Sequence, residues 1–164
     1  MRGCACTVAA VAMLALGPVP AAADWRYTRW GMTPDEVAAA SGGTVQVVPV
    51  PEGMGQDPFR IAATGRFHAE GLEWDASFTF NTDGMGVEQG GGLVCVTYLA
   101  LDDVQSVILL HMLKRDLGPP EQESAVALPG QKTLSWRTDT DRIDADFYPG
   151  SPGYVAHCAL DAPI

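Results

Sequence analysis

The hydrophobic positions follow two spacings along the chain, one typical of helices and one typical of strands. The first helical stretch opens at Thr33, which has a proline after it and Glu36 three residues on. Thr33 is thus placed as an N-cap, with Pro34 at the first helical position and Glu36 completing a capping box. Gly42 ends the stretch, so a short helix is predicted.

A second helix is predicted over 104–117, where the residues are largely apolar. Asp102 and Gln105 form another N-cap and capping-box pair in front of it. Two basic residues lie in its last turn, where they favour the negative end of a helix, and Gly118 stops it.

The remaining apolar residues mostly alternate with polar ones, which is the pattern of strands with one buried face. In the second strand the face that carries Phe59, Ile61 and Phe67 alternates with polar residues. The nearly continuous apolar run 93–101 is typical of a central strand covered on both faces. The predicted strands are 44–50, 59–70, 74–81, 93–101, 131–137, 142–148 and 154–160, with an irregular loop over Pro49 to Pro58 and a hairpin turn at 81–84.

The first residues have the order of a secretory signal. Arg2 is followed by the uncharged apolar stretch 7–17 and then by the small residues Ala21 to Ala23. Residues 1–23 are therefore predicted to be a cleaved signal peptide, and 24–164 a single domain in the periplasm or outside the cell. The apolar stretch is too short to span a bilayer, and too little precedes Cys4 for a lipid anchor.

The net charge and the cysteines limit the binding partners and the disulfides that the sequence allows. The chain has a formal net charge of −10, and removal of Arg2 makes the mature domain more acidic, which disfavours nucleic acid and anionic lipid surfaces. Cys95 and Cys158 are the two cysteines left after the signal peptide. In an oxidising compartment they form a candidate disulfide, with two separate buried thiols as the alternative.

Three short motifs carry a resemblance to a known family. Trp30 to Val37 (WGMTPDEV) resembles the G-M-T-x-x-E-V helix opening of small SmpA/OmlA-type envelope proteins and of the β-lactamase-inhibitor-protein-like fold. Phe78 to Gly84 and Leu117 to Pro120 resemble the hairpin and the helix end of the same proteins. The lipid-attachment cysteine of the SmpA/OmlA type is missing.

The resemblance implies an α+β fold of two helix-plus-three-strand repeats, with the helices packed on one antiparallel sheet. The two halves would cover about 30–100 and 101–160. Binding of another protein is the usual role of such proteins, although a fold does not fix a function.

No catalytic or metal motif stands out. His68 is expected on the surface, His111 in the packing of the second helix, and His157 and Cys158 on opposite faces of one strand. The carboxylate cluster Asp139, Asp141, Asp144 and Asp146 is interpreted as a turn and a solvated strand face, since it lacks the glycine and glutamate of a calcium loop. No cofactor and no metal ion are predicted.

The sequence therefore predicts a non-enzymatic envelope or extracellular protein that binds another protein on its sheet face or through the Pro49 to Pro58 loop. Trp136 and Tyr148 are the candidate contact residues, because aromatic side chains often anchor such contacts. A periplasmic protein that binds a small ligand or a metal ion is the alternative, and a hydrolase ranks third.

Overall fold

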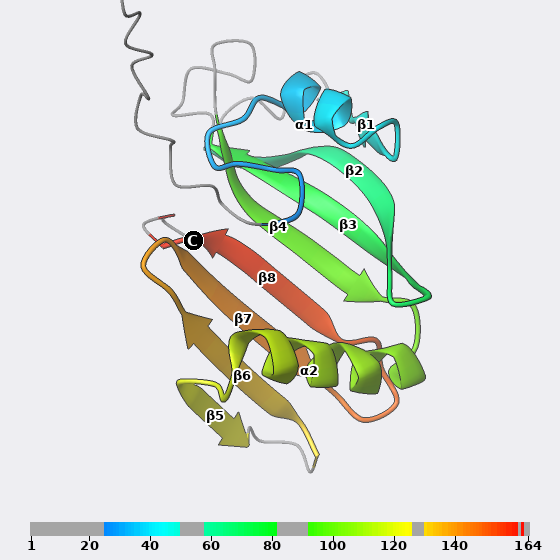
Figure 1. The fold of residues 1–164 in the computed structure, drawn as a ribbon, viewed down its shortest axis with the longest axis vertical. Coiled ribbons are helices and arrows are strands. Elements are labelled where there is room, and N and C mark those ends of the chain that lie inside the picture. Colours follow the sequence, from blue (N-terminus) through cyan, green and yellow to red (C-terminus); the bar gives the residue numbers. More distant parts are fainter. Residues whose placement is uncertain (1–24, 50–57, 82–91, 126–129, 161, 163–164) are drawn as a thin grey trace, which may run out of the picture.

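The structure, a computed structural model, describes residues 25–49, 58–81, 92–125, 130–160 and 162. The described residues form one eight-stranded antiparallel sheet with strand order β1-β2-β3-β4-β8-β7-β6-β5 and two helices (Figure 1). The elements in chain order are α1 Pro34–Ala40, β1 Val45–Val47, β2 Phe59–Ala69, β3 Leu72–Asn81, β4 Leu93–Ala100, α2 Asp103–Leu117, β5 Gln122–Ala125, β6 Lys132–Arg137, β7 Asp141–Phe147 and β8 Tyr154–Ala159.

The predicted α+β fold of two helix-plus-three-strand repeats is wrong. The molecule is mostly sheet, and its helices occupy different places: α1 packs against β1 and β2 at one edge, whereas α2 passes over β6 to β8 (Figure 1). One strand, β5, was not predicted at all, because Gln122–Ala125 has no alternation of apolar and polar residues. Pairing with β6 alone makes this segment a strand.

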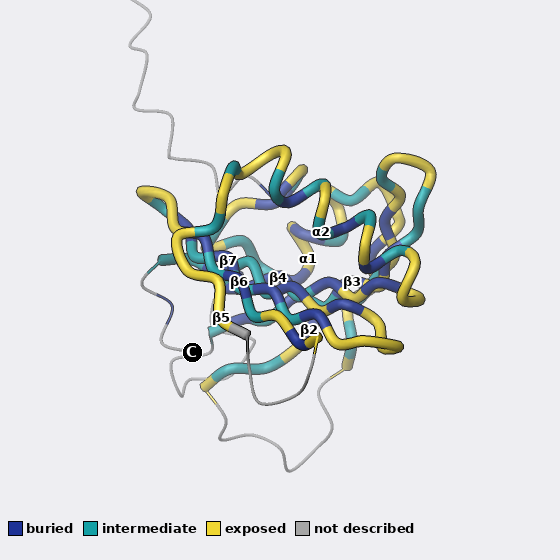
Figure 2. Tube along the Cα trace, turned by 90° about the horizontal axis from the view of Figure 1, so that it is seen from below, coloured by how far each residue is buried: buried dark blue, intermediate teal, exposed yellow. Residues whose placement is uncertain are grey.

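The core lies between the sheet and the helices as one apolar cluster, to which Val37 of α1 and Leu109 and Leu113 of α2 contribute. Strand β3 behaves as predicted, because Trp74, Phe78 and Phe80 on its inner face are fully buried. Buried residues follow the strands, whereas the outer turns of the helices are exposed (Figure 2). The fold therefore buries one face of the sheet most completely.

A bulge in β2 changes the predicted faces of that strand. The pairing with β3 shifts between Ile61 and Ala63, so that Ala62 and Ala63 are both buried. A bulge inserts one extra residue into a strand, and the part of the strand before it is rotated relative to the part after it. Phe67 consequently points into the core as predicted, but Ile61 does not, since it is 52% exposed.

Both predicted helix starts are confirmed. The Oγ1 atom of Thr33 accepts a hydrogen bond from the backbone N–H of Glu36 at 3.3 Å, and the Glu36 carboxylate accepts one from the Thr33 N–H at 2.8 Å. The Thr33 hydroxyl also donates to this carboxylate at 3.1 Å, and the bonds from the N–H and the hydroxyl of Thr33 hold the pKa of the Glu36 carboxyl below its usual value. Asp102 accepts from the N–H of Gln105 at 2.8 Å at the start of α2.

Cys95 of β4 and Cys158 of β8 face one another in the register of these strands, and their Sγ atoms are joined in a disulfide. The predicted cysteine pair is therefore in place. As predicted from the strand period, Cys158 and His157 lie on opposite faces: His157 reaches the core side, and the disulfide lies on the other side with Ala162.

Some predictions fall on residues outside the described ranges. They are the signal peptide over 1–23, most of the Pro49 to Pro58 loop and the turn at 82–84. Within the ranges that are described, no helix is long and apolar enough to cross a membrane.

A first prediction compares two isoleucines. Ile143 is 1% exposed and Ile61 is 52% exposed, so Ile143→Ala should lower the free energy of unfolding by about 2–5 kcal/mol through lost burial and a new cavity. Ile61→Ala should change it by less than about 0.5 kcal/mol. Urea denaturation followed by circular dichroism measures both. Equal losses would contradict the bulge.

A second prediction concerns the disulfide, which links residues 63 apart in sequence. The double variant Cys95→Ala/Cys158→Ala should lose about 2–5 kcal/mol of stability, because the unfolded chain is no longer restrained. Wild-type protein unfolded in the presence of a reductant should show a similar loss. A reductant that left the wild-type midpoint unchanged would show that the bridge is not formed.

Candidate functional site

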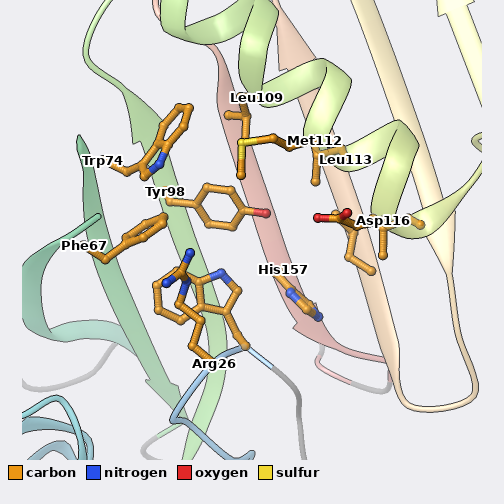
Figure 3. Close-up of a pocket in the computed structure, with 12 residues that line it drawn as sticks. Arg26, Phe67, Trp74, Tyr98, Leu109, Met112, Leu113, Asp116 and His157 are labelled. Carbon is orange, nitrogen blue, oxygen red and sulfur yellow. The ribbon is translucent and has the colours of Figure 1, made fainter. Parts of the chain in front are cut away.

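A pocket with a cavity volume of about 300 Å³ lies between α2 and the inner face of the sheet (Figure 3). Its walls come from four parts of the chain that are far apart in sequence: the segment before α1, the strands β2 to β4, the helix α2, and the strands β7 and β8. The lining residues on the sheet side and in the first segment are Trp25, Arg26, Phe67, Trp74, Tyr98, Ile143 and His157, and those from α2 are Leu109, Met112, Leu113, Asp116 and Leu117.

Aromatic rings form one continuous wall. Phe67 and Trp74 are partners in the pairing of β2 with β3, and their rings lie 6.2 Å apart in a nearly parallel arrangement. Trp25 meets Phe67 edge to face at 4.8 Å and lies 5.7 Å from Tyr98. Offset and edge-to-face contacts of this kind are favourable beyond the area they bury, so the wall is held in a fixed shape.

The segment before α1 closes one side of the pocket. Thr28 donates hydrogen bonds from its N–H and its hydroxyl to the carbonyl oxygen of Trp25, which makes a tight turn. Arg26 within this turn has φ 59°, a left-handed conformation that is uncommon for a residue with a side chain. Its guanidinium lies 4.7 Å from the centre of the Phe67 ring, and Figure 3 shows it at the edge of the aromatic wall.

A buried donor without a partner lies in this wall. Trp74 is fully buried, and its indole N–H has no hydrogen-bond partner within the part of the chain that the structure describes. Leaving such a group unpaired costs about 1–3 kcal/mol. Because the nitrogen atom itself is buried, this donor lies within the wall and is not exposed to the cavity.

Tyr98 brings a second polar group into the apolar wall. Burial raises the pKa of its phenol above the usual 10.0, which outweighs the opposite effects of the Arg26 charge and of a hydrogen bond with the Trp25 side chain. The hydroxyl is therefore neutral at physiological pH. It points across the cavity toward Asp116 and His157 (Figure 3).

The acidic residue of the pocket, Asp116, is already engaged. Arg115 donates to its two carboxylate oxygens at 2.6 and 3.0 Å. These hydrogen bonds keep the pKa of the Asp116 carboxyl below its usual value. Asp116 is exposed and remains ionised, and it shares the Arg115 guanidinium with Glu70.

A buried carboxylate lies next to the pocket, beside the lining residue His157. Asp141, 7% exposed, accepts hydrogen bonds from the indole of Trp30 at 2.8 Å and from the hydroxyl of Thr140 at 2.7 Å. The Nε2 atom of His157 lies 3.5 Å from the same carboxylate. Because Trp30 belongs to the segment before α1, this cluster fixes that segment against β7 and β8.

The two predicted protein-contact residues differ in their exposure to solvent. Trp136 is buried at 4% exposure and donates its indole N–H to the carbonyl of Gly118 at 3.0 Å, which ties β6 to the end of α2. It cannot serve as an exposed anchor in this state. Tyr148 is 40% exposed, after the end of β7, and stays available.

For the histidines and the carboxylate cluster, some of the predicted positions agree with the structure and others do not. His68 is exposed as predicted, but His111 is exposed on α2 and does not pack in the core. Asp144 and Asp146 lie on the outer face of β7 as predicted and accept hydrogen bonds from β6. The burial of Asp141 was missed. Nowhere in the described ranges do three His, Cys, Asp or Glu side chains converge as a metal site would need.

The residues of the pocket were missed by sequence reasoning. Trp25 and Arg26 were placed only at the start of the predicted mature domain, and Phe67, Trp74 and Tyr98 only within strands. The one available signal was a concentration of aromatic residues on strands predicted to be neighbours. The sequence has no signal that α2 and the segment before α1 line the same cavity.

Comparison with known proteins adds little. No family model and no curated protein matches the chain. A solved structure, that of a DUF4309 family protein (YjgB) from Bacillus subtilis subsp. subtilis str. 168, aligns over 82% of this chain and 83% of that one, with 16% identity and a TM-score of 0.46. None of these comparisons brings in a catalytic family. They leave the resemblance to SmpA/OmlA-type proteins as a prediction.

A third prediction concerns Tyr98. A phenol whose pKa is raised on folding contributes stability that is present below pH 10.0 and is lost as the pH rises above that value. The wild type should therefore lose up to about 1.4 kcal/mol per pH unit from this group above its unfolded pKa. Tyr98→Phe should reduce the loss between about pH 8 and pH 11, as measured by urea denaturation.

Tyr148→Phe is the matched control, since Tyr148 is 40% exposed. It should retain the alkaline loss of the wild type. If Tyr98→Phe and Tyr148→Phe behave alike, the Tyr98 hydroxyl is not buried as described.

Proposed function

We propose that this chain is an exported, non-enzymatic binding protein whose pocket beneath α2 holds a small, largely apolar molecule. One observation carries the proposal: a cavity of about 300 Å³ lies beneath α2, and aromatic rings from the first segment and from β2 to β4 form its wall. This was the second function predicted from the sequence, and the geometry supports it better than the first.

The size and lining of the cavity fit a small ligand. Ligand pockets are typically about 300–1,000 Å³, mostly apolar, with a few polar groups, and this cavity is at the small end of that range. The apolar wall would favour a ligand by about 25 cal/mol for each Å² removed from water.

The lining favours binding over catalysis. The pocket residues within the described ranges include no Ser, Cys or Lys that could act as a nucleophile. Asp116 is held by Arg115, and His157 lies beside Asp141. The arrangement thus supports retention of a molecule more directly than its conversion.

Export is supported by the order of features over residues 1–23 and by the cysteine pair. A disulfide persists in an oxidising compartment and is rare in the cytosol, and Cys95 and Cys158 are paired here. The periplasm or the extracellular space is therefore the proposed location.

Binding of another envelope or extracellular protein remains a second proposal. Two exposed aromatic residues support it: Tyr148 and Tyr154 are each 40% exposed. Aromatic side chains are enriched among the residues that dominate protein interfaces. Tyr148→Ala combined with Tyr154→Ala should abolish co-purification of a stoichiometric partner from the native envelope, and an unchanged yield of that partner would contradict this surface.

A fourth prediction tests the pocket. Calorimetric titration with a neutral aromatic probe such as indole should show one saturable site with a Kd of about 0.1 mM. Met112→Phe should abolish this binding, because Met112 lines the cavity and the larger side chain fills it. Val107→Phe is the control, since Val107 is on the same helix and 57% exposed.

Retained binding in Val107→Phe with loss in Met112→Phe supports the pocket, provided both variants keep the wild-type circular dichroism spectrum. Equal binding by the wild type and both variants would place the probe elsewhere and contradict the proposed function.

A further inference from the structure

We infer that the ligand of this pocket is a small organic acid: an apolar, preferably aromatic body that carries a carboxylate, with Arg26 as the residue that selects the charge. The inference rests on the proposed function and specifies the chemical class of its ligand. It is based on the hydrogen-bonding groups of the pocket that can still bind a ligand.

The available polar groups are donors. The guanidinium of Arg26 presents several N–H groups, and the neutral hydroxyl of Tyr98 can donate as well. The lining carboxylate, Asp116, already accepts two hydrogen bonds from Arg115. A ligand that supplies acceptor oxygens therefore matches more of the polar groups of the pocket than one that supplies donors.

Arg26 has no acidic partner of its own. No carboxylate among the described residues lies within 4.0 Å of its guanidinium, and its one hydrogen bond goes to the carbonyl of His68 at a long 3.4 Å. The planar guanidinium fork suits a carboxylate, which it can bind through two parallel hydrogen bonds. An unpaired arginine at an apolar wall is thus a fitting receptor for that group.

The backbone at Arg26 gives a second, independent observation. Its φ of 59° costs energy for a residue with a side chain, and such conformations gather at ligand-binding positions, where the surroundings enforce them. Here the turn from Trp25 to Thr28 imposes the conformation and brings the guanidinium over Phe67. The strain therefore serves to place the cation beside the cavity.

The same placement argues against a cationic ligand. Aromatic walls often bind ammonium groups by cation–π attraction. In this pocket Arg26 already lies over Phe67 at 4.7 Å and near Trp25 at 6.0 Å. A second cation would meet the charge of the first, so the wall excludes ammonium ligands and favours an anion.

The two ends of the pocket differ in character. Arg26 lies on one side of the Tyr98 ring, and Leu109 and Met112 lie on the other (Figure 3). A molecule with its carboxylate at Arg26 would place its apolar body along Tyr98 toward α2. The Trp74 indole and the Tyr98 hydroxyl lie beside that path.

The test uses three probes of one shape: 3-phenylpropanoate, the neutral 3-phenylpropanamide and the cationic 3-phenylpropylamine. Calorimetry at low salt on the full mature protein should show the acid binding at least about tenfold tighter than the amide, and the amine weakest. Arg26→Gln should lower the affinity for the acid about tenfold and leave the affinity for the amide within about twofold.

Arg29→Gln is the matched control, because Arg29 is an exposed arginine of the same segment that does not line the pocket. It should keep the preference for the acid. Unchanged amide binding in Arg26→Gln shows that the pocket is intact, so loss of acid binding cannot come from misfolding.

The outcomes separate the two proposals. Equal affinity for acid and amide, with both lost in Met112→Phe, would overturn the organic-acid inference and leave the proposed function standing. A preference for the acid that survives Arg26→Gln would also overturn it. Failure of indole and of all three probes to bind would overturn both.

Discussion

The pairing of β4 with β8 is the constraint on which the rest of the molecule depends. These strands are neighbours at the centre of the sheet and join β1–β4 to β5–β8. Because side chains alternate between faces, the register that brings Tyr98 and His157 to the pocket side also places Cys95 opposite Cys158 on the other side. A slip by one residue would exchange the faces of β8. The disulfide and the pocket therefore depend on the same register.

The parts of the fold that could be predicted are those with local causes. The N-cap at Thr33 and the one at Asp102 act over three residues, so both helix starts were found at the right positions. The alternation of large aromatic residues in β3 survives because that strand is paired on both sides. In the Trp30 to Val37 motif, Gly31 has φ 85° and donates its N–H to Leu93. The motif is thus explained by structural roles.

The parts that could not be predicted depend on contacts between distant residues. The bulge at Ile61 follows from how β2 fits β3, and the strand character of Gln122–Ala125 follows from β6. Asp141 was expected in a turn exposed to solvent, yet Trp30 from the first segment covers it. The pocket is the extreme case, since its walls come from four separate stretches and no stretch alone has the pattern of a binding site.

The hydrogen bond between Trp30 and Asp141 has a consequence for the order of folding. It joins residues 111 apart in sequence, and contacts of such separation form late because they require closure of a long loop. The segment with Trp25 and Arg26 is made early during synthesis and has partners in the first half of the sheet, at Phe67 of β2 and Leu93 of β4. Only its bond to Asp141 requires β7. The first segment can therefore dock on β1–β4 before β7 is in place, and the bond between Trp30 and Asp141 is the contact that joins it to β5–β8.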